Sequence, residues 1–148
     1  MPHASFARFV RAALDAQRAI GSKGGETQIL AETQVYIGLN DAVTKKQEFD
    51  TARYVSALKR VCTQYGVPFS FDVINGGYIH DNGEYTEERT ILLTFIDVGQ
   101  KTIDEIARDL CDFFRQESVL ITTDYIRARS VRGVFTEHPE EESPSEEG

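Results

Sequence analysis

The residues that could do chemistry in this chain gather in one short segment, "GGYIHDNGEYTEERTILLTFID" at positions 76–97. Its Asn-Gly pair predicts the tight turn of a β-hairpin. A structural hairpin needs only such turn residues and an alternating apolar pattern. This one also carries many polar and aromatic side chains close to its turn: Tyr78, His80, Asp81, Glu84, Tyr85, Glu87, Glu88 and Arg89.

Glu87 and Glu88 are adjacent in this hairpin, so their side chains point to opposite faces and at most one can enter a shared pocket. A two-residue turn would pair Tyr78 with Glu87, whereas a three-residue turn with a bulge would pair Tyr78 with Glu88. For an isolated pair of glutamates the simplest interpretation is two solvated edge charges, one of them neutralised by Arg89. The residues alone leave the choice open.

Other common chemistries lack the residues that they need. Neither GxxxxGK[ST] nor GxGxxG occurs, so no common phosphate-binding loop is predicted. No pair of Cys or His residues has the spacing of a metal site, and the sequence predicts neither a metal nor a cofactor. A Ser-His-Asp triad would have to use His80, and no serine lies in a recognisable nucleophile turn.

Composition and charge narrow the class of protein further. A chain of 148 residues with 41% hydrophobic residues fits one ordinary domain with a real core. The net charge of −8 arises mostly in residues 137–148, which hold six of the 24 acids and no Lys or Arg, and which we expect to be disordered. The other 136 residues carry 18 acids and 16 bases, a balance that argues against nucleic-acid binding.

The sequence also predicts a cytoplasmic protein. There is no run of about 18 apolar residues, so no membrane span is expected. The first residues lack the continuous apolar centre of a secretory signal. Cys62 and Cys111, the only cysteines, both lie in helical patterns and are interpreted as reduced, buried residues.

Periodicity predicts the elements that must position these side chains. After Ser5, apolar residues at helical spacing predict an N-terminal helix over 6–20, which glycines at 21, 24 and 25 end. Asp50 is the expected N-cap of the next helix and Gly66 its stop, while Thr102 and Glu105 form an expected capping box. The sequence then predicts strands at 33–39, 67–76, 89–98 and 118–131, and further helices at 51–65 and 102–114.

The expected order β-α-β-β-α-β predicts an α+β fold, a ferredoxin-like sandwich with an extra N-terminal helix and a disordered acidic tail. The corresponding domains are an appendage with its linker at 1–30, the ferredoxin-like domain at 31–136, and the tail at 137–148. Two helices cover only one face of such a sheet. We therefore expect oligomerisation to bury the other face.

The order of three motifs resembles the phage S-adenosylmethionine (SAM) lyases, also called SAM hydrolases. These motifs are "GGY" (76–78), "YTEERT" before an apolar strand (85–90), and "FFRQESVLITT" after a helix (113–123). The resemblance covers about a third of the chain clearly and the βαββαβ core loosely. It implies a metal-independent carbon–sulfur lyase that needs no cofactor, a homotrimer with SAM bound at subunit boundaries, and depletion of SAM in the cytoplasm of an infected bacterium.

The resemblance also assigns roles to residues. Glu88 becomes the functional carboxylate and Tyr78 the pocket aromatic. The substrate-binding residues that it implies are Gln116, Phe69, Phe71 and Glu87. Glu87 is retained because the insert after Tyr78 is one residue shorter than in the phage pattern.

Two other interpretations fit the sequence. A PII-like or other ferredoxin-like small-molecule sensor shares the expected topology, and "YIGLN" (36–40) with "QESVL" (116–120) fits small ferredoxin-like proteins of bacteria. A structural or interaction protein of the same fold is the third. Only the lyase would convert SAM to methylthioadenosine.

Overall fold

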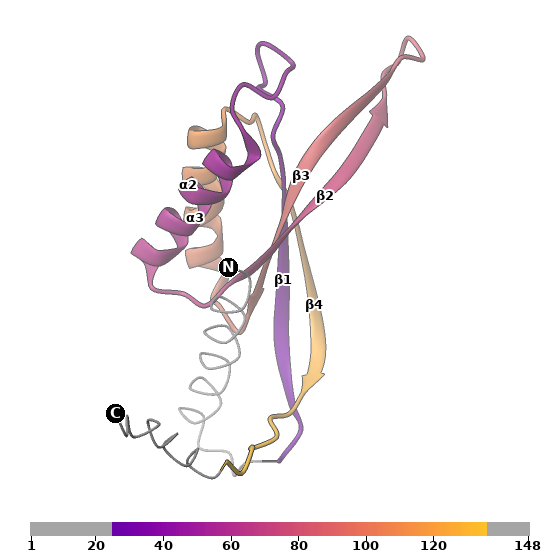
Figure 1. The fold of residues 1–148 in the computed structure, drawn as a ribbon. Coiled ribbons are helices and arrows are strands. Elements are labelled where there is room, and N and C mark those ends of the chain that lie inside the picture. Colours follow the sequence, from indigo (N-terminus) through magenta and orange to yellow (C-terminus); the bar gives the residue numbers. More distant parts are fainter. Residues whose placement is uncertain (1–24, 136–148) are drawn as a thin grey trace, which may run out of the picture.

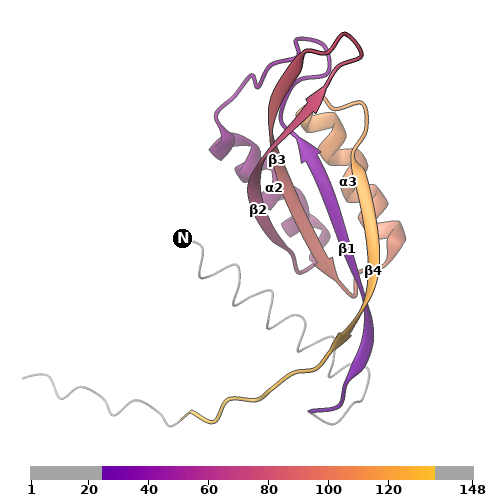
Figure 2. The same cartoon turned by 90° about the vertical axis from the view of Figure 1, so that its right-hand side faces the viewer.

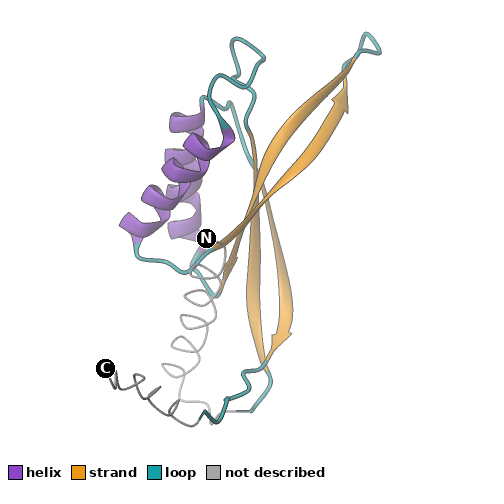
Figure 3. Cartoon of the chain, viewed as in Figure 1, coloured by secondary structure: helices purple, strands orange, loops and turns teal. Residues whose placement is uncertain are grey.

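The computed structural model describes residues 25–135, in which the chain forms a sheet covered by helices (Figure 1). The element order confirms the predicted α+β fold and its βαββαβ sequence (Figure 3). The expected helix at 6–20 and the acidic tail at 137–148 lie outside the described residues, so the division into domains stays a prediction. The elements are β1 (Gln28–Gly38), α2 (Thr51–Tyr65), β2 (Ser70–Ile79), β3 (Tyr85–Ile96), α3 (Gln100–Phe114) and β4 (Leu120–Ala128).

The strands within residues 25–135 form one antiparallel sheet in the order β2-β3-β1-β4. Both α2 and α3 pack on the same face of this sheet, as the two perpendicular views show (Figures 1 and 2). In the described part of the chain no element covers the opposite face, which we call the open face. Residues of β1 and β3 alternate between these two environments, because successive side chains of a strand point to opposite sides.

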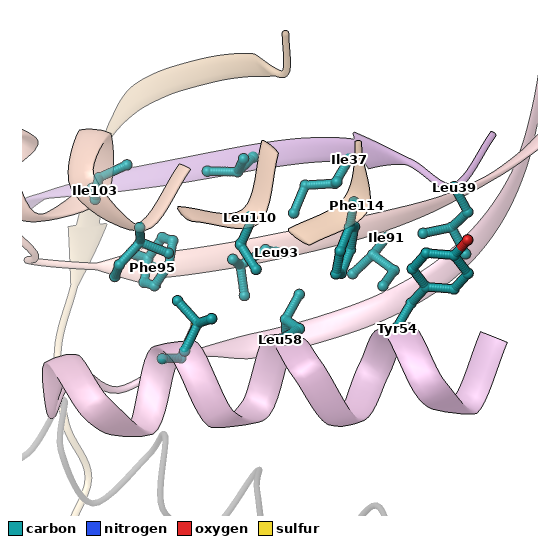
Figure 4. Packing of buried hydrophobic residues seen from close by; sticks show 14 residues of the cluster. Ile37, Leu39, Tyr54, Leu58, Ile91, Leu93, Phe95, Ile103, Leu110 and Phe114 are labelled. Atoms are coloured by element: carbon teal, nitrogen blue, oxygen red, sulfur yellow. The ribbon is translucent and has the colours of Figure 1, made fainter. Parts of the chain in front are cut away.

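The hydrophobic core lies between the sheet and the two helices (Figure 4). Tyr54 and Leu58 of α2 face Leu110 and Phe114 of α3, and the rings of Tyr54 and Phe114 meet edge to face with centroids 5.0 Å apart. The strands contribute fully buried side chains: Val35, Ile37, Leu39, Ile91, Leu93 and Phe95. This packing fixes which residues of β1 and β3 remain on the open face.

The two described helices begin alike, after a residue with extended backbone, Asp50 or Gly99, and without a capping hydrogen bond from a side chain of that residue. Helix α2 starts after Asp50 and ends at Gly66, whose left-handed backbone (φ 66°) fits the predicted stop. For α3 the predicted capping box was wrong. The helix starts at Gln100, since the Gly99 carbonyl already accepts a hydrogen bond from the Ile103 amide at 3.1 Å, and Thr102 therefore lies inside the helix.

The β2–β3 hairpin turns through three residues, Asp81 to Gly83, as two hydrogen bonds between His80 and the residues Gly83 and Glu84 show. Gly83 has the left-handed backbone (φ 84°) that this turn requires. Both predicted pairings of Tyr78 were wrong, because this turn pairs Tyr78 with Thr86. The outer part of the ribbon continues past the end of β1, whose last partner on β3 is Thr90.

Both cysteines were predicted to be reduced and buried. Cys62 is buried and Cys111 half-buried, and neither forms a disulfide within the described residues. Burial raises the pKa of the Cys62 thiol to about 12 and also raises the pKa of Cys111.

Among residues 25–135, neither helix combines the length and the apolar character that crossing a bilayer requires.

Candidate functional site

A pocket of about 380 Å³ lies beyond the end of β1, where three segments meet. These segments are the loop 40–45, the β2–β3 ribbon and the junction between α3 and β4. The pocket is lined by Asn40, Asp41, Ala42, Lys45, Tyr78, Glu88, Gln116, Glu117 and Ser118. Three residues that the sequence singled out, Tyr78, Glu88 and Gln116, are thus brought together.

The register of the hairpin decides which glutamate shares the face of Tyr78. Because Tyr78 lies opposite Thr86, the side chain of Glu88, two positions further on, points to the same open face. Glu87 points to the other face and is exposed. Tyr78 is 40% exposed, and its ring packs edge-on against His80 at a centroid distance of 4.7 Å.

The Glu88 carboxylate is held at the end of β1. Its Oε1 accepts a hydrogen bond from the Asn40 amide at 3.1 Å. The carboxylate also lies over Gly38, where a side chain would collide with it. Backbone pairing between β1 and β3 has already ended at this point, after the bond from the Leu39 amide to the Arg89 carbonyl. The Glu88 side chain on β3 thus continues the contact with the chain that follows β1.

Gln116 links the loop 40–45 to the junction between α3 and β4 by a hydrogen bond. Its Nε2 donates to the Asn40 carbonyl at 2.5 Å, and the Ala42 amide donates to the Arg115 carbonyl at 2.9 Å. Arg115 adopts a left-handed backbone (φ 52°) at the C-terminal end of α3, which directs the chain back toward this loop. Gln116 therefore lines the pocket and also positions Asn40, the residue that holds Glu88.

Asp41 is the buried charge of the site, with a side chain only 5% exposed. Its Oδ1 accepts hydrogen bonds from the Val43 amide at 2.7 Å and the Thr44 amide at 3.0 Å, and its Oδ2 lies 2.6 Å from Nε of Arg115. The Thr44 and Val43 amides, followed by the Arg115 guanidinium, hold the pKa of Asp41 below its ordinary value of 3.8. Asp41 is therefore a charged residue that organises the loop.

The charges of the pocket suit a ligand with charges of both signs. Arg115 offsets Asp41, which leaves the carboxylates of Glu88 and Glu117 and one basic lining residue, Lys45. Carboxylates beside an aromatic ring attract a cation, and a lysine attracts a carboxylate. Within residues 25–135 no three His, Cys, Asp or Glu side chains are grouped as a metal ion would need.

The structure does not bring the other predicted site residues into this pocket. Phe69 and Phe71 pack against the hydrophobic core, with their rings stacked 6.5 Å apart, because Phe71 lies opposite the buried Leu93. Glu87 contributes only its backbone carbonyl, which accepts from Nδ2 of Asn40 at 3.3 Å. Of the four substrate-binding residues that the resemblance implies, only Gln116 therefore lines this pocket.

The loop 40–45 was not predicted to contribute to the site, yet it supplies Asn40, Asp41 and Lys45 to the pocket. One signal was available: the apolar strand changes abruptly to Asn-Asp where β1 ends, and such residues form turns whose side chains accept backbone hydrogen bonds. Glu117 and Ser118, next to Gln116, were also missed. Gln116 and Glu117 additionally line a neighbouring cavity of about 440 Å³ beside α3.

Comparison with known proteins gives information on the fold. No protein-family model matches the chain, and no curated protein matches it. A solved phage SAM lyase in complex with S-methyl-5'-thioadenosine is similar, with 18% identity, a TM-score of 0.50, and coverage of 73% of this chain and 92% of that one.

Two further solved structures have TM-scores below 0.5. A phage SAM lyase in the apo state has a TM-score of 0.49 and 19% identity, over 76% of this chain and 98% of that one. The GlnK–ATP complex of B. subtilis has a TM-score of 0.46 and 12% identity, over 71% and 85%. The phage SAM lyase in complex with S-methyl-5'-thioadenosine reaches a TM-score of 0.50, and this similarity shows that the chain has the fold of a phage SAM lyase.

Proposed function

We propose that the protein is a SAM lyase that releases methylthioadenosine and homoserine lactone. One observation carries the proposal: Tyr78, Glu88 and Gln116, selected from the sequence, line a single pocket. The chain around that pocket has the fold of a phage SAM lyase. The pocket also carries charges of both signs, as a substrate with an ammonium, a sulfonium and a carboxylate requires.

The proposed reaction needs little from the protein. SAM carries its own leaving group, the sulfonium, and its own nucleophile, the methionine carboxylate. A carboxylate oxygen bonds to Cγ while the Cγ–S bond breaks, and the bonding electron pair leaves with sulfur as neutral methylthioadenosine. The amino acid closes to homoserine lactone. Holding the reacting atoms in attack geometry can lower the barrier by about 7–11 kcal/mol at the limit.

The pocket residues have matching roles in this proposal. Glu88 binds a cationic group of SAM, the ammonium or the sulfonium, and transfers no proton. The ring of Tyr78 adds a cation–π attraction of about 0.5–2 kcal/mol to the sulfonium. Lys45, the basic residue of the pocket lining, binds the substrate carboxylate before reaction, and Gln116 holds the loop that carries Asn40.

The proposal also covers the oligomeric state of the protein and the effect of its reaction in the cell. The open face and the exposed side of the pocket favour assembly of several copies of the chain, and the resemblance to the phage SAM lyases implies that this assembly is a homotrimer with SAM at subunit boundaries. Tyr78, 40% exposed in the single chain, would be covered by such a neighbour. In the cytoplasm of a bacterium infected by a phage, the reaction would deplete SAM and so oppose SAM-dependent restriction.

The direct test is to incubate the purified protein with SAM and to separate the products by chromatography. The proposal requires methylthioadenosine to form with the wild-type protein and not with Glu88→Gln prepared in the same way. This control removes the charge of Glu88 and keeps its size. Binding of SAM by calorimetry without turnover would reject the lyase and favour a small-molecule sensor of the same fold.

A further inference from the structure

We infer that Gly38 is a positioning residue for Glu88: the absence of a side chain at position 38 lets the carboxylate lie across β1 and reach the Asn40 amide. The geometric part of this inference stands on the contacts alone. Its catalytic consequence rests on the proposed lyase function. Gly38 is the last residue of β1 and lies opposite Thr90 on β3, one step along the open face from Glu88.

Backbone conformation does not explain a glycine at this position. The glycines of the described chain that have a positive φ are Gly25, Gly66 and Gly83. Gly38 is not among them, so other residues could adopt its backbone. A glycine inside a strand also costs stability, and often marks a place where another group approaches the backbone closely.

The approaching group is the Glu88 side chain. A Cβ atom at Gly38 would lie 2.5 Å from Cδ of Glu88, 3.0 Å from Oε2, and closer still to Oε1. Oε1 is the oxygen that accepts the hydrogen bond from the Asn40 amide. One methyl group at position 38 would therefore displace the carboxylate from the position in which Asn40 holds it.

The same contact predicts that the fold tolerates the change. The atoms in conflict are at the far end of a flexible side chain, which can rotate away without moving the backbone. Glu88 is only half-buried, so a rotated carboxylate still reaches water. Gly38→Ala should thus separate the position of the carboxylate from the stability of the protein.

Gly76 offers a matched control. It lies directly opposite Glu88 on β2, and it too is a strand glycine beside this residue. A Cβ at Gly76 would lie 3.5 Å from the Glu88 carbonyl oxygen and 3.6 Å from Oγ1 of Thr90, which is ordinary contact. Gly76→Ala therefore adds the same methyl group without touching the carboxylate.

The experiment compares wild type, Gly38→Ala, Gly76→Ala and Glu88→Gln by three measurements: the NMR shift of the Asn40 amide proton, the thermal midpoint, and kcat and KM for SAM. A hydrogen bond to a charged acceptor moves an amide proton downfield. We expect Gly38→Ala and Glu88→Gln to lose this shift and Gly76→Ala to keep it. The kcat/KM of Gly38→Ala should fall about 100-fold, the loss that a misplacement of about 1 Å can cause, while its thermal midpoint does not fall below that of wild type.

An unchanged Asn40 amide in Gly38→Ala would overturn the inference. A shifted amide with full activity would overturn the catalytic role of the positioning. If wild type itself does not turn over SAM, the lyase proposal fails, and the amide comparison still decides whether Gly38 positions Glu88. The two failures are thus distinguishable.

Discussion

Tyr78 and Glu88 lie on the same face of the β2–β3 ribbon, because the register places Tyr78 opposite Thr86. A shift of one residue would exchange Glu88 for Glu87 on this face. The two adjacent acids therefore have different surroundings: Glu88 lines the pocket and contacts Asn40, whereas the Glu87 side chain is exposed on the opposite face.

This difference predicts unequal effects of the same substitution. Glu88→Gln should reduce SAM turnover by at least about 100-fold, since the neutral amide no longer attracts a cation and orientation is lost. Glu87→Gln, its matched control, should change turnover less than about twofold. Initial rates of methylthioadenosine formation measure both. Equal rates for the two variants would exclude the proposed role of Glu88.

Tyr78 should act through its ring and not through its hydroxyl group. Tyr78→Phe keeps the aromatic face, so we expect a loss of activity of less than about threefold. Tyr78→Ala removes a cation–π attraction of about 0.5–2 kcal/mol and should cost more, about 2- to 30-fold in kcat/KM. If Tyr78→Phe were as impaired as Tyr78→Ala, the hydroxyl group would carry the function and the cation–π role would be wrong.

The fold was predictable from sequence because its signals are local and repeated. Apolar alternation in β3 and helical periodicity in α3 each recur over many residues, so a few exceptions do not hide them. The cap of α3 was not predictable in the same way. Thr102 and Glu105 have the spacing of a capping box, but Gly99 already ends the loop and starts the helix.

The site was predictable only in part, because it depends on contacts between distant segments. Tyr78, Glu88 and Gln116 could be selected by resemblance, yet the hairpin register follows from the conformation of Gly83. Phenylalanine suits a pocket wall and a hydrophobic core equally well, so the residue type of Phe69 and Phe71 does not decide between the two locations. Only the sheet order shows that they pack against the core.

The pH dependence of stability should reveal the role of Asp41. Its pKa is lowered in the folded protein, first by the Thr44 and Val43 amides and then by Arg115. Its contribution is therefore present above its ordinary pKa of 3.8 and is lost as the pH falls through the lower folded value. Because Arg115 is 63% exposed, we expect the backbone hydrogen bonds to dominate over the ion pair.

Asp41→Asn should accordingly lower the thermal midpoint at pH 7, and the difference from wild type should shrink as the pH falls below about 4. Asp81→Asn, at the exposed hairpin turn, is the control and should have little effect at either pH. Thermal unfolding followed by circular dichroism from pH 7 to pH 3 measures this. A difference that grew toward acid would contradict the assigned direction of the pKa shift.

The open face should be an interface between copies of the chain. Leu92, Tyr36 and Leu120 form a continuous row across it, because Tyr36 pairs with Leu92 on one side and with Leu120 on the other. Leu120 is 62% exposed in the single chain. We expect light scattering to give about three times the chain mass of 16.6 kDa.

Leu92→Lys should shift this assembly toward the monomer, because it places a charge in the middle of the apolar row. Lys101→Ala, which changes an exposed residue on α3 away from the row, should leave the mass unchanged. A wild-type monomer at micromolar concentration would rule out the trimer. It would also remove the reason for placing the pocket at a subunit boundary.

The identity of the nucleophile gives the sharpest test of the proposed reaction, because attack by the substrate carboxylate and attack by water form different products. Intramolecular displacement uses the substrate carboxylate, so methylthioadenosine and homoserine lactone should appear together. Homoserine should follow only as the lactone opens in solution. Since substrate supplies both nucleophile and leaving group, EDTA should not change the rate.

Water enriched in heavy oxygen separates this route from hydrolysis by the position of the label. Water that opens the lactone attacks its carbonyl carbon, so the label enters the carboxylate of homoserine and the first-formed lactone contains none. Water that attacks SAM directly would bond to Cγ and label the hydroxyl group of homoserine. Mass spectrometry of product fragments distinguishes the two oxygens. Label in the hydroxyl group of the earliest product would mean that the protein activates water, and that Glu88 must be reconsidered as a base.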